Sequence, residues 1–228
     1  NAEFWFGTDT LGRDMFSCIW HGGRVSLLIG LASTALSTVI AIVYGAISGI
    51  AGEKVDTLLM RFTEIILSIP NLLLIIFLQA IMGKATIGSI SVVIGLTSWF
   101  GIAKIIRTEV RQLRSSEYVI AAKCMGGSFW HILWKHLAPN FVSSIMFMVV
   151  MNIRSAIVAE STLSFLGIGL PLEVISWGSM LSLSEKALMT NSWWIIVIPG
   201  AFLITVLMCI TNLGHWLQTR VSHQEAKL

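Results

Sequence analysis

The stretch VSLLIGLASTALSTVIAIVYGAISGIAG, from Val25 to Gly52, contains no charged side chain. A helix needs ~20 apolar residues to cross ~30 Å of hydrocarbon, and buried helices of soluble proteins are usually shorter. The stretch is also too long for the apolar core of a signal peptide, and no small-residue cleavage site follows it. It therefore predicts a helix that stays in a membrane.

Four further stretches share this character. Each is uncharged and bounded by Lys, Arg, Asp or Glu, and they run from Ile65 to Gly83, Ala85 to Ala103, Leu137 to Ile153 and Ala187 to Thr219. Only 12% of all residues are charged, about half the share of a typical soluble domain. A membrane barrel would show ~10-residue segments of alternating polarity, whereas these stretches are apolar on every side. The sequence predicts an all-α integral membrane protein with about five spanning helices.

The ends of the spans are less well defined by the sequence. The fourth span can extend through Arg154 and Glu160 if both charges are tolerated in the membrane, and the fifth stretch contains a loop as well as a span. The chain begins at Asn1 rather than Met, with a polar stretch before the first span. We therefore expect a segment with a sixth helix to precede it.

Basic residues are concentrated between the third and fourth stretches. The connection between them carries Lys104, Arg107, Arg111, Arg114, Lys123 and Lys135. The C-terminal tail, which five crossings place on the same side, adds Arg220 and Lys227. The opposite side holds only Arg13, Arg24, Lys84 and Lys186. Short loops rich in Lys and Arg stay in the cytoplasm. We predict that residues 104–140 and the tail 220–228 are cytoplasmic, and that residues 1–24 and 170–191 are extracytoplasmic, the latter as a cap.

Residues 104–140 are too polar to span the membrane, and they contain too many helix-forming residues to be an irregular loop. The sequence predicts two helices that are separated at Gly126–Gly127. An apolar stripe at helical spacing indicates that the first helix continues the third span: Ile106, Val110 and Leu113. Ser128 is the predicted N-cap of the second helix, and Pro139 marks the return to the membrane.

Within this connection, four small or apolar residues lie three or four positions apart: Tyr118, Ala121, Ala122 and Met125. A groove in another protein can accept such a helical face. From the residues alone, a second interpretation stays open. The connection could instead be a solvated loop with a basic rim.

The stretch EYVIAAKCMGGSFWHILWKHLAPN, residues 117–140, resembles the EAA loop of binding-protein-dependent ABC importer permeases. That motif is Glu-Ala-Ala followed by Gly and, about a dozen residues on, by Pro. Four of its positions are matched here by Ala121, Ala122, Gly126 and Pro139. The Glu of the triplet is Ile120 in this chain, with Glu117 earlier in the sequence. The motif is therefore altered, but its spacing is kept.

Further signatures narrow the family. WFGTDTLGRDMFSCIWHGGRVSLLIG (5–30), ESTLSFLGIGLP (160–171) and WGSML (177–181) are similar to the C-type permease subunit of oligopeptide, dipeptide and nickel importers. The chain is identified as a member of this family from Phe6 to about Leu217. The resemblance implies a MetI-like bundle, with residues 25–219 as the permease domain. The tail departs from the acidic ending of relatives, and we assign it no role.

The resemblance implies a transmembrane subunit of the bacterial inner membrane that works by alternating access. In this family the EAA loop forms a coupling helix that sits in a cleft of a separate ATPase. Carried over to this chain, its contacts are Glu117, Tyr118, Ala121, Ala122, Met125, Gly126 and Pro139. The implied partners are a homologous B-type permease in a heterodimer, two ABC ATPases, an extracytoplasmic substrate-binding protein and the lipid bilayer, and they include no nucleic acid.

No catalytic, cofactor or metal site is predicted in the chain itself. A phosphate-binding GxxxxGK[ST] segment is missing from the sequence, since Gly83–Lys84 lacks the flanking residues of that motif. ATP and Mg²⁺ are therefore expected on the partner ATPases. His131 and His136 do not form the HExxH pattern of a metalloprotease.

Two charges within the fourth span need an explanation, because a charge at the centre of a bilayer costs ~2.5–3.5 kcal/mol even on insertion scales. Arg154 and Glu160 are about 240° apart on a regular helix, so they are not expected to pair with each other. One hypothesis places one or both on the wall of a translocation path, and the alternative is a structural contact with another helix or with the partner subunit.

Peptides are the favoured substrate, and nickel or a metal chelate is the alternative within the same family. An ion-gradient transporter is less favoured, because the chain shows no convincing internal repeat. Two features are interpreted as structural. The Gly45 and Gly49 pair predicts close helix packing, and Pro70 and Pro199 predict bends within spans.

Overall fold

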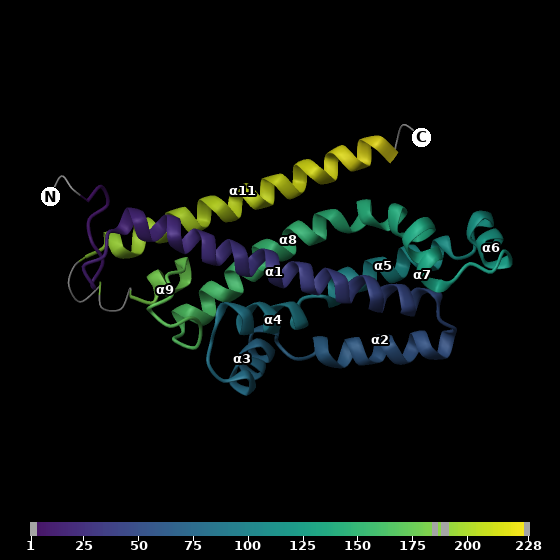
Figure 1. The fold of residues 1–228 in the computed structure, drawn as a ribbon, viewed down its shortest axis with the longest axis horizontal. Helices are drawn as coiled ribbons and strands as arrows, with labels where there is room; N and C mark the ends of the chain where they lie inside the picture. Colours follow the sequence, from purple (N-terminus) through teal and green to yellow (C-terminus); the bar gives the residue numbers. More distant parts are fainter. Residues whose placement is uncertain (1–3, 184–186, 188–191, 226–228) are drawn as a thin grey trace.

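The computed structural model describes residues 4–183, 187 and 192–225. Its elements are α1 (Met15–Ile50), α2 (Glu53–Leu67), α3 (Asn71–Met82), α4 (Ile87–Thr97), α5 (Phe100–Leu113), α6 (Glu117–Cys124), α7 (Phe129–Ile132), the π-helix η1 (Leu133–Leu137), α8 (Ala138–Phe165), α9 (Trp177–Leu181) and α11 (Trp194–Glu225). Figure 1 shows an elongated bundle in which α1, α8 and α11 run along the long axis. The all-α prediction is confirmed.

Three helices are long and apolar enough to cross a membrane alone. They are α1, the part of α8 from Ser144 to Phe165, and the part of α11 from Trp194 to Thr219. Two helix pairs qualify only when each pair is taken as one bent span. The pair α2 and α3 is bent by 88°, and the pair α4 and α5 by 43°. In the described residues the structure thus has three candidate spans, and it has the predicted five if each bent pair crosses the membrane as one span.

Pro70 explains the first break. It has no N–H to donate and its ring excludes a regular preceding turn, so α2 ends at Leu67 and Pro70 becomes the N-cap of α3. Pro199, by contrast, lies inside α11, which continues through it. The second break, at Ser98–Trp99, is not marked by proline. The sequence predicts a continuous third span here, and the structure divides it into α4 and α5.

Several helix ends also differ from the predicted spans. The first helix begins at Met15 rather than near Val25, because the Asp14 carboxylate caps it by accepting from the N–H groups of Phe16 and Ser17. The fourth span does extend beyond Ile153, as far as the end of α8.

Helix α1 occupies the centre of the bundle and packs against α4, α5 and α8. Small residues permit the contact with α5. A Cβ atom added to Gly45 would lie 2.6 Å from the carbonyl oxygen of Ala103, and one added to Gly49 would lie 2.7 Å from Val110. The predicted packing role of this glycine pair is confirmed.

We expect Gly45→Ala to lower the free energy of unfolding by about 1–3 kcal/mol, because the new methyl group must push α5 away from α1. The matched control is Gly200→Ala in α11, where no atom lies within 4 Å of the added Cβ. That change should be neutral or stabilising, since alanine is the better helix former. Thermal unfolding of both purified variants in detergent measures the difference, and equal midpoints would contradict the packing role.

Candidate functional site

The segment that resembles the coupling loop forms α6, α7 and η1, and it projects at one end of the bundle between α5 and α8 (Figure 1). Gly126 has a φ of +78°. The N–H of Gly127 donates to the carbonyl of Ala122 at 3.0 Å, which is the 6→1 bond of a Schellman motif and ends α6. The predicted helix stop is therefore confirmed.

The start of the next helix is confirmed as well. The hydroxyl oxygen of Ser128 accepts from the N–H of His131 at 3.3 Å, as an N-cap does. One feature differs from the prediction, because residues 114–116 separate α5 from α6. The third span therefore does not continue unbroken to Gly126.

The predicted coupling face of α6 is divided between two environments. Ala122 is buried, whereas Ala121 and Glu117 are exposed and Met125 is 82% exposed. The side chains of Tyr118 and Pro139 lie outside the described part of the structure. Val119 is buried beside Ala122 and holds α6 against the bundle. The exposed residues alone are free to contact another protein.

A buried carboxylate lies where α1, α2 and α5 meet. Asp56 on α2 is 3% exposed. Its oxygens accept from both Nε and Nη2 of Arg107 at 2.5 Å, from Arg111 and from the Ser48 hydroxyl at 2.6 Å. A bidentate guanidinium contact of this kind fixes geometry as well as charge. We call Asp56, Ser48, Arg107 and Arg111 the Asp56 clamp.

Arg114 strengthens the same junction. Its guanidinium donates to the carbonyls of Gly49 at 3.3 Å and Ala51 at 3.2 Å, at the end of α1. Helices leave their last carbonyls without internal partners, and a cation there satisfies them. The sequence placed these arginines on a basic rim and did not assign them to the clamp. The available signal was the spacing of Arg107 and Arg111, which puts both on one face of α5.

Glu160 lies near the opposite end of α8 and is fully buried. Its carboxylate accepts from the hydroxyls of Ser26 on α1 at 3.1 Å, Ser164 at 2.9 Å and Ser176 at 2.7 Å. Ser176 is also the N-cap of α9. We call Glu160 and these three serines the Glu160 cluster. It joins α1, α8 and the segment that precedes α9, and this arrangement favours the structural interpretation of Glu160.

Arg154 lies apart from Glu160, as the helical spacing predicts. It is exposed and borders a cavity of about 330 Å³ between α8 and α11. The other lining residues are Ile204, Leu207, Met208, Thr211 and Asn212. A role of Arg154 in a translocation path stays a prediction. Among the described residues, no group of three or more His, Cys, Asp or Glu is placed to hold a metal ion.

The apolar bundle and its projecting segment have the architecture that the sequence predicts for a membrane component of a transporter. Residues 18–223 match the family model described as "Binding-protein-dependent transport system inner membrane component". The chain belongs to this family.

Relatives of known designation cover nearly the whole chain. It is 36% identical over 218 residues to the dipeptide transport system permease protein DppC of Bacillus subtilis, covering 96% of this chain and 68% of that protein. It is 38% identical over 213 residues to the oligopeptide transport system permease protein OppC of Haemophilus influenzae, covering 93% and 68%. Among solved structures, an inward-facing MetNI methionine ABC transporter chain matches with a TM-score of 0.69 at 16% identity, covering 91% of this chain and 97% of that one. This match shows the MetI-like fold.

Proposed function

We propose that the chain is the C-type permease subunit of an ABC importer that carries dipeptides and oligopeptides across the bacterial inner membrane. The observation that carries the proposal is the similarity, over more than nine-tenths of the chain, to permeases named for dipeptide and oligopeptide transport. Those names do not favour the nickel alternative. The subunit performs no covalent chemistry, and ATP and Mg²⁺ bind to separate ATPase subunits.

The partners follow from the proposed role. They are a homologous B-type permease, two ATPases and an extracytoplasmic binding protein. Helix α6 is the segment that contacts an ATPase, with Glu117, Ala121 and Met125 on its exposed side. Figure 1 places α6 and the end of α11 toward the same end of the bundle. Because basic loops stay inside, that end and the C-terminus are cytoplasmic in this proposal.

The Asp56 clamp supports a mechanism for coupling. A movement of the ATPases can change the transporter only if it favours one conformation of the spans over the other. Arg107 and Arg111 lie on α5, which leads directly into the coupling segment, and both hold Asp56 of α2. Displacement of α6 therefore acts on α1, α2 and α5 together, and these helices respond as one unit.

The proposal is tested with Gly126→Asp in the complete complex, reconstituted in liposomes with cognate ATPases and binding protein. Aspartate at a positive φ is strained, and it adds a charge beside the exposed face of α6. We expect ATP hydrolysis stimulated by peptide-loaded binding protein to fall by about ten-fold, an effect of about 1.4 kcal/mol on coupling.

Gly83→Asp is the matched control. Gly83 also has a positive φ, +79°, and at both positions no atom lies within 4 Å of an added Cβ. Gly83 connects α3 to α4, away from α6, so this variant should retain stimulation. If only nickel-loaded binding protein stimulates ATP hydrolysis, the substrate is nickel rather than peptide. If the chain associates with no ATPase, the proposal that it is a subunit of an ABC importer is wrong.

A further inference from the structure

A cavity of about 290 Å³ lies where the two broken spans meet α8. Its walls come from the α2–α3 junction, the α4–α5 junction and α8. The polar residues that line it are Asn71, Thr97, Ser98, Asn152 and Ser155. No charged side chain is found among the described residues of its wall. The cavity therefore offers only uncharged donors and acceptors.

Part of this polar surface has no partner among the residues that the structure describes. Asn152 donates its amide hydrogens to the hydroxyl of Ser37 at 3.2 Å and to the carbonyl of Ser98 at 3.0 Å. The second bond satisfies a carbonyl at the break between α4 and α5. Asn71 and Ser155 are exposed, and in the described part of the chain no residue hydrogen-bonds to either side chain. Their polar groups are available to water or to a ligand.

The cavity is also at membrane depth. Ser155 lies at the middle of the candidate span Ser144–Phe165. Figure 1 shows both helix junctions about midway along the bundle. Irregular backbone and unpaired polar groups are not tolerated against lipid, and at this depth they occur only where they are covered by protein or line a water-filled space. This face of the chain therefore does not face hydrocarbon.

We propose that this cavity forms part of the wall of a water-filled pathway, and that its amide and hydroxyl groups bind the main chain of a peptide in transit. The inference rests on the proposed function and adds a site to it. Every peptide presents main-chain N–H and C=O groups, whatever its side chains, and these match uncharged amides and hydroxyls. A wall without charge also holds a passing substrate weakly enough for release.

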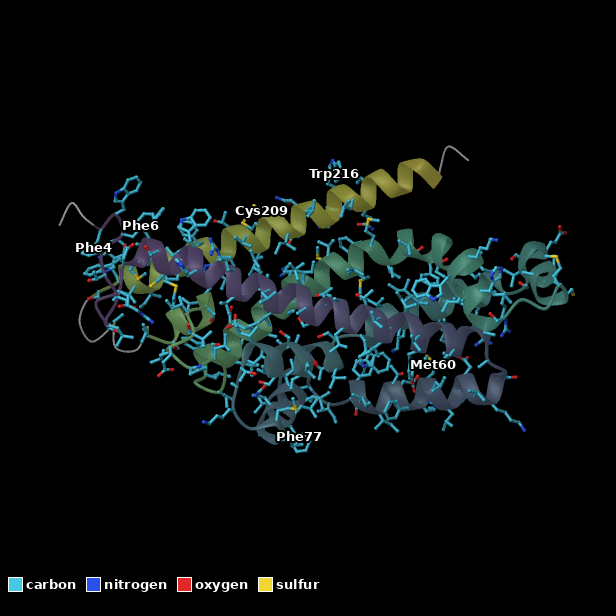
Figure 2. All side chains as sticks on the ribbon, viewed as in Figure 1. Phe4, Phe6, Met60, Phe77, Cys209 and Trp216 are labelled. Atoms are coloured by element: carbon cyan, nitrogen blue, oxygen red, sulfur yellow. The ribbon has the colours of Figure 1, made fainter. Side chains whose placement is uncertain are left out.

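The test measures thiol labelling in the reconstituted complex. Cys18, Cys124 and Cys209 are first replaced by alanine, and Asn71→Cys and Ser155→Cys are then introduced singly. Phe77→Cys is the control for Asn71, because Phe77 is on the same helix, is 62% exposed, and points away from the bundle (Figure 2). Leu31→Cys, on α1 and 54% exposed, is the control for Ser155.

We expect a membrane-impermeant cationic methanethiosulfonate reagent to modify Asn71→Cys and Ser155→Cys about ten-fold faster than the two controls, since only a thiol in water ionises and reacts. Adding ATP with peptide-loaded binding protein should slow the modification of these two positions and leave the controls unchanged.

Equal labelling of all four positions would overturn the water-filled pathway. Fast labelling at Asn71→Cys and Ser155→Cys that peptide does not alter would overturn the peptide contact. Transport of labelled peptide by the cysteine-free parent is measured in the same vesicles. If that parent fails to transport while the wild-type complex also fails, the proposed substrate is wrong, and the labelling rates still decide whether the cavity is filled with water.

Discussion

Replacing Asp56 by alanine is expected to lower the free energy of unfolding by about 3 kcal/mol and to abolish peptide-stimulated ATP hydrolysis. The carboxylate is 3% exposed and is the shared acceptor of Arg107 and Arg111. Its removal leaves two guanidinium groups that face each other without a counter-charge. The arginine side chains are 25% and 33% exposed, so water offsets part of the loss, and the expected cost is at the lower end of the range for broken buried pairs.

The same helix provides the control. Arg61 and Glu64 on α2 also form an ion pair, at 2.8 Å, but their side chains are 73% and 53% exposed. Exposed pairs contribute little because water and salt screen them, so Glu64→Ala should cost no more than about 0.5 kcal/mol. Unfolding in detergent and ATP hydrolysis in liposomes are measured for both variants. Equal stability of Asp56→Ala and Glu64→Ala would show that the clamp does not hold the helices together.

Glu160→Ala is expected to destabilise the protein by about 3 kcal/mol or more, because three serine hydroxyls lose their shared acceptor in a fully buried site. The change should also release the segment before α9, since Ser176 hydrogen-bonds to Glu160 and Trp177 donates its N–H to Ser26 at 3.2 Å. Hydrogen exchange over residues 170–181 measures this release directly. We expect residues 170–181 to exchange faster in Glu160→Ala than in the wild-type protein, by more than α5 does.

Two further variants separate the possible causes. Glu160→Gln keeps the side-chain volume and one acceptor oxygen, so it should retain most of the protection. Glu173→Ala removes an exposed carboxylate from the same segment and should leave exchange unchanged. If Glu160→Ala exchanges like Glu173→Ala, the buried carboxylate does not hold the segment in place.

The sequence predicted those features that depend on neighbouring residues. Long uncharged stretches located the spans, Pro70 located a break, and the Gly126 and Ser128 pair located the end of one cytoplasmic helix and the start of the next. Each of these signals acts within a few residues of itself. Hydropathy and local capping therefore defined the order of the spans and the ends of these particular helices.

The features that the sequence did not reveal depend on contacts between distant segments. Ser98 carries no proline or glycine signal, yet its freed carbonyl is satisfied by Asn152, which is far away in the chain. The Asp56 clamp and the Glu160 cluster likewise join residues from separate helices. A single sequence shows that such charges must have partners, but only the packing shows which partners they have.

The division of α6 has a similar origin. Ala121 and Ala122 are adjacent and chemically identical, and the motif treats them as a pair. The structure buries Ala122 and exposes Ala121, because neighbouring residues on a helix point about 100° apart. Helical spacing predicted that the face would be narrow, but it could not decide which part of it the bundle would cover.

The positions of the helix breaks have a consequence for how the subunit can change shape. The Asp56 clamp fastens α1, α2 and α5 near one end of the bundle, and the Glu160 cluster fastens α1, α8 and the α9 segment near the other. Both breaks lie between these attachments (Figure 1). The subunit is thus fastened by hydrogen bonds towards its two ends and broken near its middle. If α6 is the coupling segment, as we propose, we expect a push on α6 to tilt the half-helices at these breaks, near the middle of the membrane.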